Sequence, residues 1–417
     1  MAVLLGTTVL AACGGGGADS AQPGSPACGS WPTSVMLPQD MPGSVIASVA
    51  IVDACHMLVA GHFGAANPFE PSGNTKGFVL RWRLDAHGQV HEDWRHVLDG
   101  AGTDAITSVE WVEGGIRFLG WSDGVEPGDV AYGQRDVLIG QLAADGASKR
   151  LSRVGNERPN RPLALLASEP GRAFLVGNDD VHVPTNYVEA WEEPWVAGLG
   201  LEDGQYRMDW LVPTGSEDPD TYFAAHVIPG PSFAVALARG RFAGAERGLS
   251  VEARDAHGNP LWLTPLTQSP YDNIAGLVEE PSGGLLVFGS SYQDLGGGIA
   301  GGSDLFIAGL SMPDGALSWI RSFGSPETDW AAAVAPSGDS LYAVSEVFGP
   351  GFSAWRVRLA RVSFNGEVLS EQTLVESARG VVKAAAVTGT QLVVVGGIDD
   401  GAGSVRGWAR FVAREGS

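Results

Sequence analysis

Apolar residues occur along this chain in short runs separated by glycine, aspartate and asparagine, and no stretch keeps the 3.6-residue period of an amphipathic helix. Residues 301–347 show the pattern most clearly. They read as an apolar strand, an Asp-Gly turn, a strand containing Trp319, a polar junction, a strand of small residues, a second turn and a final apolar strand. Short strands bounded by turn-forming residues predict an all-β protein.

The same order of elements recurs at intervals of 51 to 58 residues, measured between the glycines of the recurrent turn. Asp-Gly and Asn-Gly supply the positive φ angles that tight hairpins need. A strand of small residues and a strand ending in glycine complete most repeats. The turn glycines are Gly88, Gly146, Gly204, Gly258, Gly315 and Gly366, and the tryptophans of the following strand are Trp94, Trp210, Trp262 and Trp319.

Four short strands in about 56 residues are typical of a β-propeller blade. Small residues suit the innermost strand, where the blades crowd around the axis. The seventh repeat lacks its fourth strand, whereas residues 31–37 form a strand without a repeat of its own. We therefore predict an all-β, seven-bladed propeller of four-stranded blades over residues 30–417, closed by an N-terminal strand that completes the last blade. Its inner strands are expected near Ala50, Val109, Ala164, Ala225, Gly276, Ala333 and Ala385.

The repeat resembles the SBBP family, seven-bladed β-propeller repeats of large secreted bacterial proteins. An Asp-bearing strand entry, a turn ending in glycine and a Gly-Gly…Asp junction recur in that family as they do in residues 301–347. The resemblance covers about residues 30–417, although the fourth and sixth repeats lack the glycine that ends the second strand. The turn and tryptophan are also similar to quinoprotein-type propellers, which have shorter repeats and usually eight of them.

The N-terminus resembles a bacterial lipoprotein leader. The apolar run of residues 2–10 is too short to span a bilayer, and Leu10-Ala11-Ala12-Cys13 matches a lipobox. We expect residues 1–12 to be a signal peptide, Cys13 to carry the lipid, and residues 13–29 to be a flexible Gly/Ser/Pro tether. The alternative is an ordinary signal peptide with a chance cysteine. Because Gly14 follows the cysteine, similarity to known lipoprotein sorting favours the outer membrane of a bacterial envelope.

The net charge limits the classes of binding partner, and the cysteine content indicates a disulfide. The formal net charge of −22 argues against nucleic acid and anionic membrane surfaces as partners, so we expect membrane contact through the lipid alone. We also expect a monomeric protein. Besides Cys13 the chain contains Cys28 and Cys55. In an oxidising compartment these two form an even pair, so we predict a disulfide between them. A buried free thiol at Cys55 is the alternative.

Motifs for catalysis or metal binding are weak. His87, His91 and His96 do not have the spacing of a zinc site and fit a solvated outer strand, so we expect no metal and no cofactor. One aspartate recurs at each of four junctions between repeats, and we expect its side chain to cap backbone N–H groups there. These aspartates are Asp104, Asp220, Asp272 and Asp329.

The long second-to-third-strand loops of the second and third repeats, residues 121–136 and 178–195, combine aromatic and acidic residues. In a propeller they share one face of adjacent blades and provide chemistry for a sugar or a basic protein surface. The alternative is that Trp191 and Trp195 only fix a long loop to its blade. The predicted ligand-binding residues are Trp121, Asp123, Tyr132, Asp179, Asp180, Tyr187, Glu189 and Trp191.

These features favour a non-catalytic, membrane-anchored, extracytoplasmic scaffold that binds a protein or a glycan. The alternatives are a propeller enzyme, a hydrolase or lyase, or a carbohydrate-binding protein acting at the same loops. No histidine or basic residue recurs among the carboxylates of the predicted ligand face, which favours the scaffold. The fold alone does not distinguish these functions.

Overall fold

The computed structural model describes residues 28–414 except 66, 68–70, 72, 113–114, 125–131, 133, 148, 170, 182–190, 216–219, 230–233, 245–246, 299, 353, 378 and 400–403. These residues form seven antiparallel sheets of four strands each and one 3-10 helix, η1 (Pro350–Phe352). No helix in this described part is long and apolar enough to cross a membrane.

The strands follow one another from the inner to the outer edge of each blade. Blades 1 to 4 consist of β2 (Val45–Ile51), β3 (His56–Phe63), β4 (Lys76–Leu84) and β5 (Val90–Leu98); β6 (Asp104–Val112), β7 (Gly115–Ser122), β8 (Asp136–Ala143) and β9 (Lys149–Val154); β10 (Asn160–Glu169), β11 (Arg172–Val181), β12 (Trp191–Glu202) and β13 (Gln205–Pro213); and β14 (Asp220–Ile228), β15 (Ala234–Arg241), β16 (Gly248–Asp255) and β17 (Pro260–Pro265).

Blades 5 to 7 continue the same order, except that the outer strand of blade 7 comes from the start of the chain. They consist of β18 (Asn273–Glu279), β19 (Gly284–Ser291), β20 (Asp304–Ser311) and β21 (Leu317–Phe323); β22 (Thr328–Ser337), β23 (Ser340–Phe348), β24 (Trp355–Ser363) and β25 (Val368–Ser377); and β26 (Gly380–Val387), β27 (Gln391–Asp399), β28 (Val405–Ala413) and β1 (Ser34–Met36).

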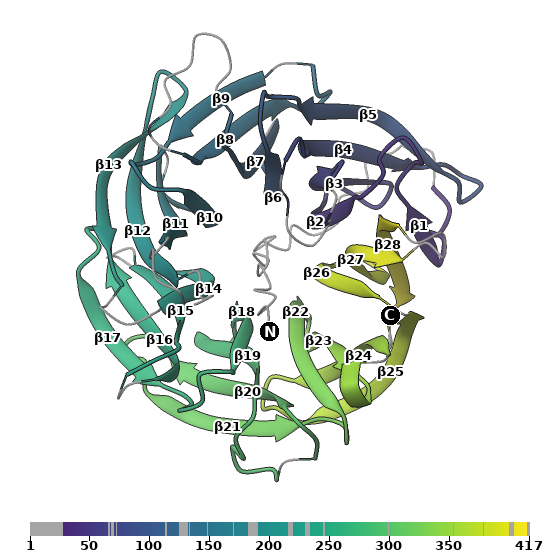
Figure 1. Ribbon diagram of the computed structural model, residues 1–417. Coiled ribbons are helices and arrows are strands. Elements are labelled where there is room, and N and C mark those ends of the chain that lie inside the picture. The colour runs from purple at the N-terminus through teal and green to yellow at the C-terminus, as the bar shows by residue number, and fades with distance from the viewer. Residues whose placement is uncertain are drawn as a thin grey trace.

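Figure 1 shows the seven sheets arranged in a ring, with the first strand of each blade nearest the centre. All seven predicted inner strands are present, and the four tryptophans of the repeat lie on outer strands. The predicted seven-bladed propeller is confirmed.

The ring is closed as the sequence predicts. Strand β1 pairs antiparallel with β28, and Ser34, Val35 and Met36 lie opposite Arg410, Ala409 and Trp408. Backbone hydrogen bonds extend this pairing on both sides of β1. The Phe411 N–H donates to the Thr33 carbonyl at 3.0 Å, and the Leu37 N–H donates to the Gly407 carbonyl at 2.8 Å.

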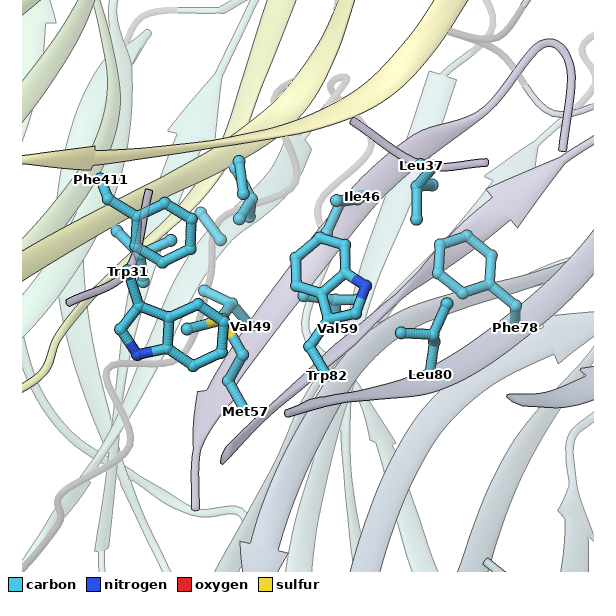
Figure 2. Close-up of a cluster of buried hydrophobic side chains, with 14 of the residues drawn as sticks. Trp31, Leu37, Ile46, Val49, Met57, Val59, Phe78, Leu80, Trp82 and Phe411 are labelled. Atoms are coloured by element: carbon cyan, nitrogen blue, oxygen red, sulfur yellow. The ribbon is translucent and has the colours of Figure 1, made fainter. Parts of the chain in front are cut away.

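The segment before β1 turns inward and contacts blade 1. The buried Trp31 ring stacks on Phe411 with centroids 5.2 Å apart, and its Nε1 donates to the Ala54 carbonyl at 3.2 Å. Figure 2 shows Trp31 and Phe411 at one end of a buried cluster that joins the last blade to the first. A disulfide links Cys28 to Cys55, with Cα atoms 5.7 Å apart. The N-terminal segment thus fastens blade 7 to blade 1.

Neighbouring blades are joined by a contact that explains the recurrent Asp-Gly turn. At four junctions, the tryptophan of an outer strand lies against the turn glycine of the next blade, as Trp210 does against Gly258. A Cβ at Gly258 would lie 2.9 Å from that ring, and the glycine also has φ = 82°. The turn therefore needs glycine for its backbone conformation and for the ring above it. The other three pairs are Trp94 with Gly146, Trp262 with Gly315 and Trp319 with Gly366.

Candidate functional site

The antiparallel order of the strands gives the propeller two different faces. Connections between blades and connections from the second to the third strand lie on one face, which we call the loop face. Turns from the first to the second strand and the Asp-Gly turns lie on the other. Cys55 lies in the turn between β2 and β3, so the disulfide is on the face opposite the loop face.

The junction aspartates organise the backbone of the loop face. Asp104 accepts a hydrogen bond from the Gly100 N–H at 2.8 Å, and Asp329 accepts one from the Ser325 N–H at 2.7 Å. The predicted capping role is confirmed for these two. Asp272 instead accepts from the Tyr292 N–H in the next connection at 2.8 Å, and Asp220 forms an ion pair with Arg239.

The three described residues of the predicted ligand set in blade 2 have different surroundings. Trp121, the penultimate residue of β7, is only 5% exposed, and the Arg135 guanidinium lies 4.2 Å from the centre of its ring. Asp123 accepts a hydrogen bond from the Thr103 backbone N–H. Tyr132 is half exposed. Trp121 and Asp123 are thus engaged within the fold, whereas Tyr132 faces solvent.

In blade 3 the predicted ligand residues are only partly described. Asp179 is buried and accepts hydrogen bonds from the Asn160 and Asn156 side-chain amides at 2.6 and 3.1 Å. Burial raises the pKa of Asp179. The backbones of Asp180 and Trp191 lie near each other at the ends of β11 and β12. Tyr187 and Glu189 lie outside the described residues.

Blade 5 presents an aromatic pair that the sequence analysis did not single out. Tyr271 precedes the junction residue Asp272, and Tyr292 follows β19, so both lie on the loop face. Their rings meet edge to face, with centroids 6.3 Å apart and planes at 77°. Tyr271 is 68% exposed and Tyr292 is 38% exposed. The sequence did contain a signal for this pair, because one tyrosine stands at the junction before β18 and the other at the β19–β20 connection of the same blade.

Hydrogen bonds fix the two backbone segments that carry the tyrosines. The Asp272 carboxylate accepts from the Tyr292 N–H and from the Ser291 hydroxyl, both at 2.8 Å, and the Gln268 N–H donates to the Gln293 side chain at 2.7 Å. Because these bonds tie the junction to the β19–β20 connection, the pair has a fixed backbone support. Rigid aromatic side chains of this kind bind partners at low entropic cost.

An exposed carboxylate accompanies the aromatic pair. Asp294, two residues after Tyr292, accepts hydrogen bonds from the Gly296 and Gly298 N–H groups at 2.9 and 3.0 Å. These bonds lower the pKa of Asp294, so it is ionised at neutral pH. The loop face of blade 5 therefore combines two accessible rings with a fixed negative charge.

One buried acid belongs to blade 6. Glu346 on β23 accepts hydrogen bonds from the Val382 N–H at 2.8 Å and from the Trp355 indole N–H at 3.0 Å. Burial raises the pKa of Glu346 to about 7. No group of three or more His, Cys, Asp or Glu side chains among the described residues is arranged to hold a metal ion.

Glu346→Gln is expected to change the pH dependence of stability. The folded-state pKa of Glu346 lies above the ordinary value of 4.5, so the protonated acid contributes its full stabilisation below about pH 4.5. This stabilisation is lost as the pH rises through about 7. The variant should therefore exceed the wild type by about 1–3 kcal/mol in unfolding free energy at pH 8 and match it near pH 4. Urea unfolding across this range measures the difference. The exposed Glu367→Gln is the control, and parallel curves for wild type and Glu346→Gln would refute the expectation.

Comparison with known proteins identifies no family. No family model matches the chain, and no curated protein matches it. Among solved structures, a chain of Kuenenia stuttgartiensis hydrazine synthase has a TM-score of 0.53 at 9% identity, covering 91% of this chain and 98% of that one. Sqt1 from Chaetomium thermophilum has a TM-score of 0.47 at 14% identity, covering 89% and 97%. YCF48 bound to D1 peptide has a TM-score of 0.48 at 10% identity, covering 94% and 100%. At these identities the likeness to hydrazine synthase extends to the propeller fold alone.

Proposed function

We propose that this protein is a non-catalytic binding scaffold of the bacterial cell envelope, and that Tyr271 and Tyr292 on its loop face contact a protein partner. The observation that carries the proposal is the exposure of both rings on a hydrogen-bonded support. Tyrosine is enriched at the energetic centres of protein interfaces, because it combines a large apolar ring with a hydroxyl group.

Charge supports a partner with a basic surface. The chain has a net charge of −22, and Asp294 places a negative charge beside the tyrosines. Complementary charge steers association and selects the partner. Tyr132 and the predicted residues Asp180, Tyr187, Glu189 and Trp191 would extend the same binding face across blades 2 and 3.

Replacement of both tyrosines is expected to release the partner. Tyr271→Ala/Tyr292→Ala removes two exposed rings without opening the core, so the fold should persist while partner recovery falls at least tenfold, as expected when an interface centre is lost. The measurement is quantitative affinity purification of the tagged full chain from the native envelope.

The matched control is Leu261→Ala/Leu263→Ala. Both leucines are 54% exposed and lie on β17, the outer strand of blade 4. This variant should keep the partner. Retention of the partner by the tyrosine variant, or its equal loss in both variants, would reject the loop face as the binding surface. Recovery of a glycan in place of a protein would identify the alternative class of ligand.

We also propose that the scaffold is an extracytoplasmic lipoprotein with SBBP-type repeats. The disulfide between Cys28 and Cys55 supports this location, because such bonds persist in oxidising compartments. Cys13 itself lies outside the described residues.

Cys13→Ala is expected to move the protein from the membrane fraction to the soluble fraction of the envelope or to the medium. Without a lipid chain, an acidic protein has little affinity for an anionic membrane surface. Fractionation followed by immunoblotting measures the change, with Cys28→Ser/Cys55→Ser as the control. Unchanged membrane partitioning of Cys13→Ala would contradict lipidation at this residue.

A further inference from the structure

The loop-face end of blade 2 contains its own positive charges. The Arg135 guanidinium lies 4.2 Å from the centre of the Trp121 ring, and Arg153 pairs with the buried Asp136 at 3.0 Å. An aromatic ring and a carboxylate at this end of the blade are thus each matched with a guanidinium group of the same chain. Such cation-π and charge-assisted contacts are stronger where the groups are shielded from water.

The repeat identifies the equivalent positions in blade 5. Asp136 and Asp304 are the first residues of β8 and β20, the third strands of their blades. The residue before each is Arg135 in blade 2 and Ser303 in blade 5, and the carbonyl group of each accepts a hydrogen bond of 2.9 Å from the first N–H or second N–H of the next blade's inner strand. A serine therefore replaces the first arginine of blade 2.

The second arginine is also absent from blade 5. Arg153 of β9 lies opposite the third residue of β8, and the residue opposite the third residue of β20 is Ser322. The Ser322 Oγ is buried without a hydrogen-bond partner in the described part of the chain. The Asp304 carboxylate is buried and accepts a hydrogen bond from the Ala300 N–H at 2.7 Å, but no basic side chain among the described residues pairs with it. Blade 5 thus keeps the buried acid of blade 2 without its cation.

A second buried acid lies at the same end of blade 5. Asp272 accepts hydrogen bonds from the Ser291 hydroxyl and the Tyr292 N–H, and within the described ranges it also has no basic partner. Ser291 of β19 lies opposite Asp304 of β20, so the two buried carboxylates flank the strand that leads to Tyr292. The exposed Asp294 adds a third negative charge. Buried carboxylates without a counter-ion attract a cation strongly, because little water screens them.

The exposed tyrosines provide a place for that cation. Tyr271 directly precedes Asp272, and Tyr292 directly follows Ser291. Both rings reach solvent, and their planes form a corner, at 77° with centroids 6.3 Å apart. A cation in this corner lies within about 6 Å of both ring centres, which is the range of cation-π attraction.

Building on the function proposed above, we propose that the tyrosine pair of blade 5 binds the guanidinium group of an arginine side chain of the protein partner. The guanidinium group would contact both rings and gain electrostatic attraction from Asp294, Asp272 and Asp304. Arginine fits better than lysine, because its planar and weakly hydrated head group stacks on aromatic rings. The partner would thus supply to blade 5 the charge that blade 2 obtains from its own arginines.

The test titrates the full chain, with isotope-labelled tyrosine, with N-acetyl-arginine methylamide at constant ionic strength. The ring signals of Tyr271 and Tyr292 in NMR spectra should shift and saturate. The neutral analogue N-acetyl-citrulline methylamide should bind at least tenfold more weakly. Equal binding of the two compounds, no shift with either, or tighter binding of N-acetyl-lysine methylamide would overturn the assignment of a guanidinium group.

Three carboxylate substitutions make the result specific. Asp294→Asn and Asp304→Asn keep an oxygen that can accept the backbone hydrogen bonds, and each should weaken binding of the arginine derivative at least threefold. The matched control is Asp314→Asn, which removes an exposed carboxylate of the same blade from the turn on the opposite face. If both Asp294→Asn and Asp304→Asn bind the derivative as tightly as Asp314→Asn does, these acids do not form part of the site.

Partner recovery separates this site from the proposed function. Loss of the partner by Tyr271→Ala/Tyr292→Ala, with no binding of the arginine derivative to wild type, would keep the loop face as the binding surface and reject the guanidinium contact. Binding of the derivative as described, with the partner retained by the tyrosine variant, would instead reject the proposed function.

Discussion

Deletion of residues 30–38 is expected to lower the melting temperature far more than deletion of residues 14–27. The first deletion removes β1, the only outer strand of blade 7, together with the buried Trp31 that stacks on Phe411. Without them blade 7 exposes the edge of β28 and loses its apolar contact with blade 1. Differential scanning calorimetry of the two purified proteins measures the effect.

Trp31→Ala tests the same closure of the ring by a point substitution, without shortening the chain. Loss of a buried tryptophan typically destabilises a protein by about 3–5 kcal/mol. Trp31 is buried in the cluster that joins blades 7 and 1, so we expect a loss in that range. If Trp31→Ala and both deletions were equally harmless, closure by the N-terminal segment would be wrong.

Gly61→Ala is expected to destabilise the protein by about 3 kcal/mol or more, near the upper end of the range for forcing atoms into a packed interior. Gly61 is the recurrent glycine near the end of the second strand of blade 1, and it lies opposite a β-bulge of β2, where the pairing shifts by one residue between Ile46 and Ser48. A Cβ there would overlap the Val45 carbonyl oxygen and lie 3.1 Å from the Ala47 nitrogen. Both neighbours are backbone atoms of a buried strand, so they cannot move aside as a flexible side chain would.

Gly389→Ala is the matched control for this substitution. Gly389 is exposed, has no atom within 4 Å of an added Cβ, and is not among the glycines with positive φ. Chemical denaturation should show little change for Gly389→Ala. Equal unfolding free energies for the two variants would mean that the glycine of the second strand is not needed for packing against the bulge.

The blade pattern can be predicted from the sequence because every repeat depends on the same local chemistry. The glycine of the turn adopts positive φ, and at four junctions it also contacts the tryptophan ring of the preceding blade, so glycine and tryptophan recur together along the chain. The exceptions are informative. They concern the other recurrent glycine, near the end of the second strand: Arg239 and Ser345 occupy its position in blades 4 and 6, and Arg239 forms an ion pair with the buried Asp220.

The binding surface was harder to predict, because the sequence indicates where a strand ends but not which way a side chain turns there. Trp121 and Tyr271 both stand beside a connection on the loop face. Trp121 is the penultimate residue of a strand and packs inward against Arg135, whereas Tyr271 lies within a junction and faces solvent. The pairing of β26 with β27 shifts by one residue at Lys383, and this irregularity could not be predicted either, because such a shift leaves no mark on a strand of small residues.

Site-specific photo-cross-linking in living cells tests the central claim, that the loop face of blade 5 holds the partner. A photoreactive phenylalanine analogue is placed at position 271 or, as the control, at position 263 on the outer strand of blade 4. The account predicts a discrete protein adduct from position 271 that Tyr292→Ala weakens, and no such adduct from position 263. A partner that cross-links at position 263 and never at position 271 would contradict it.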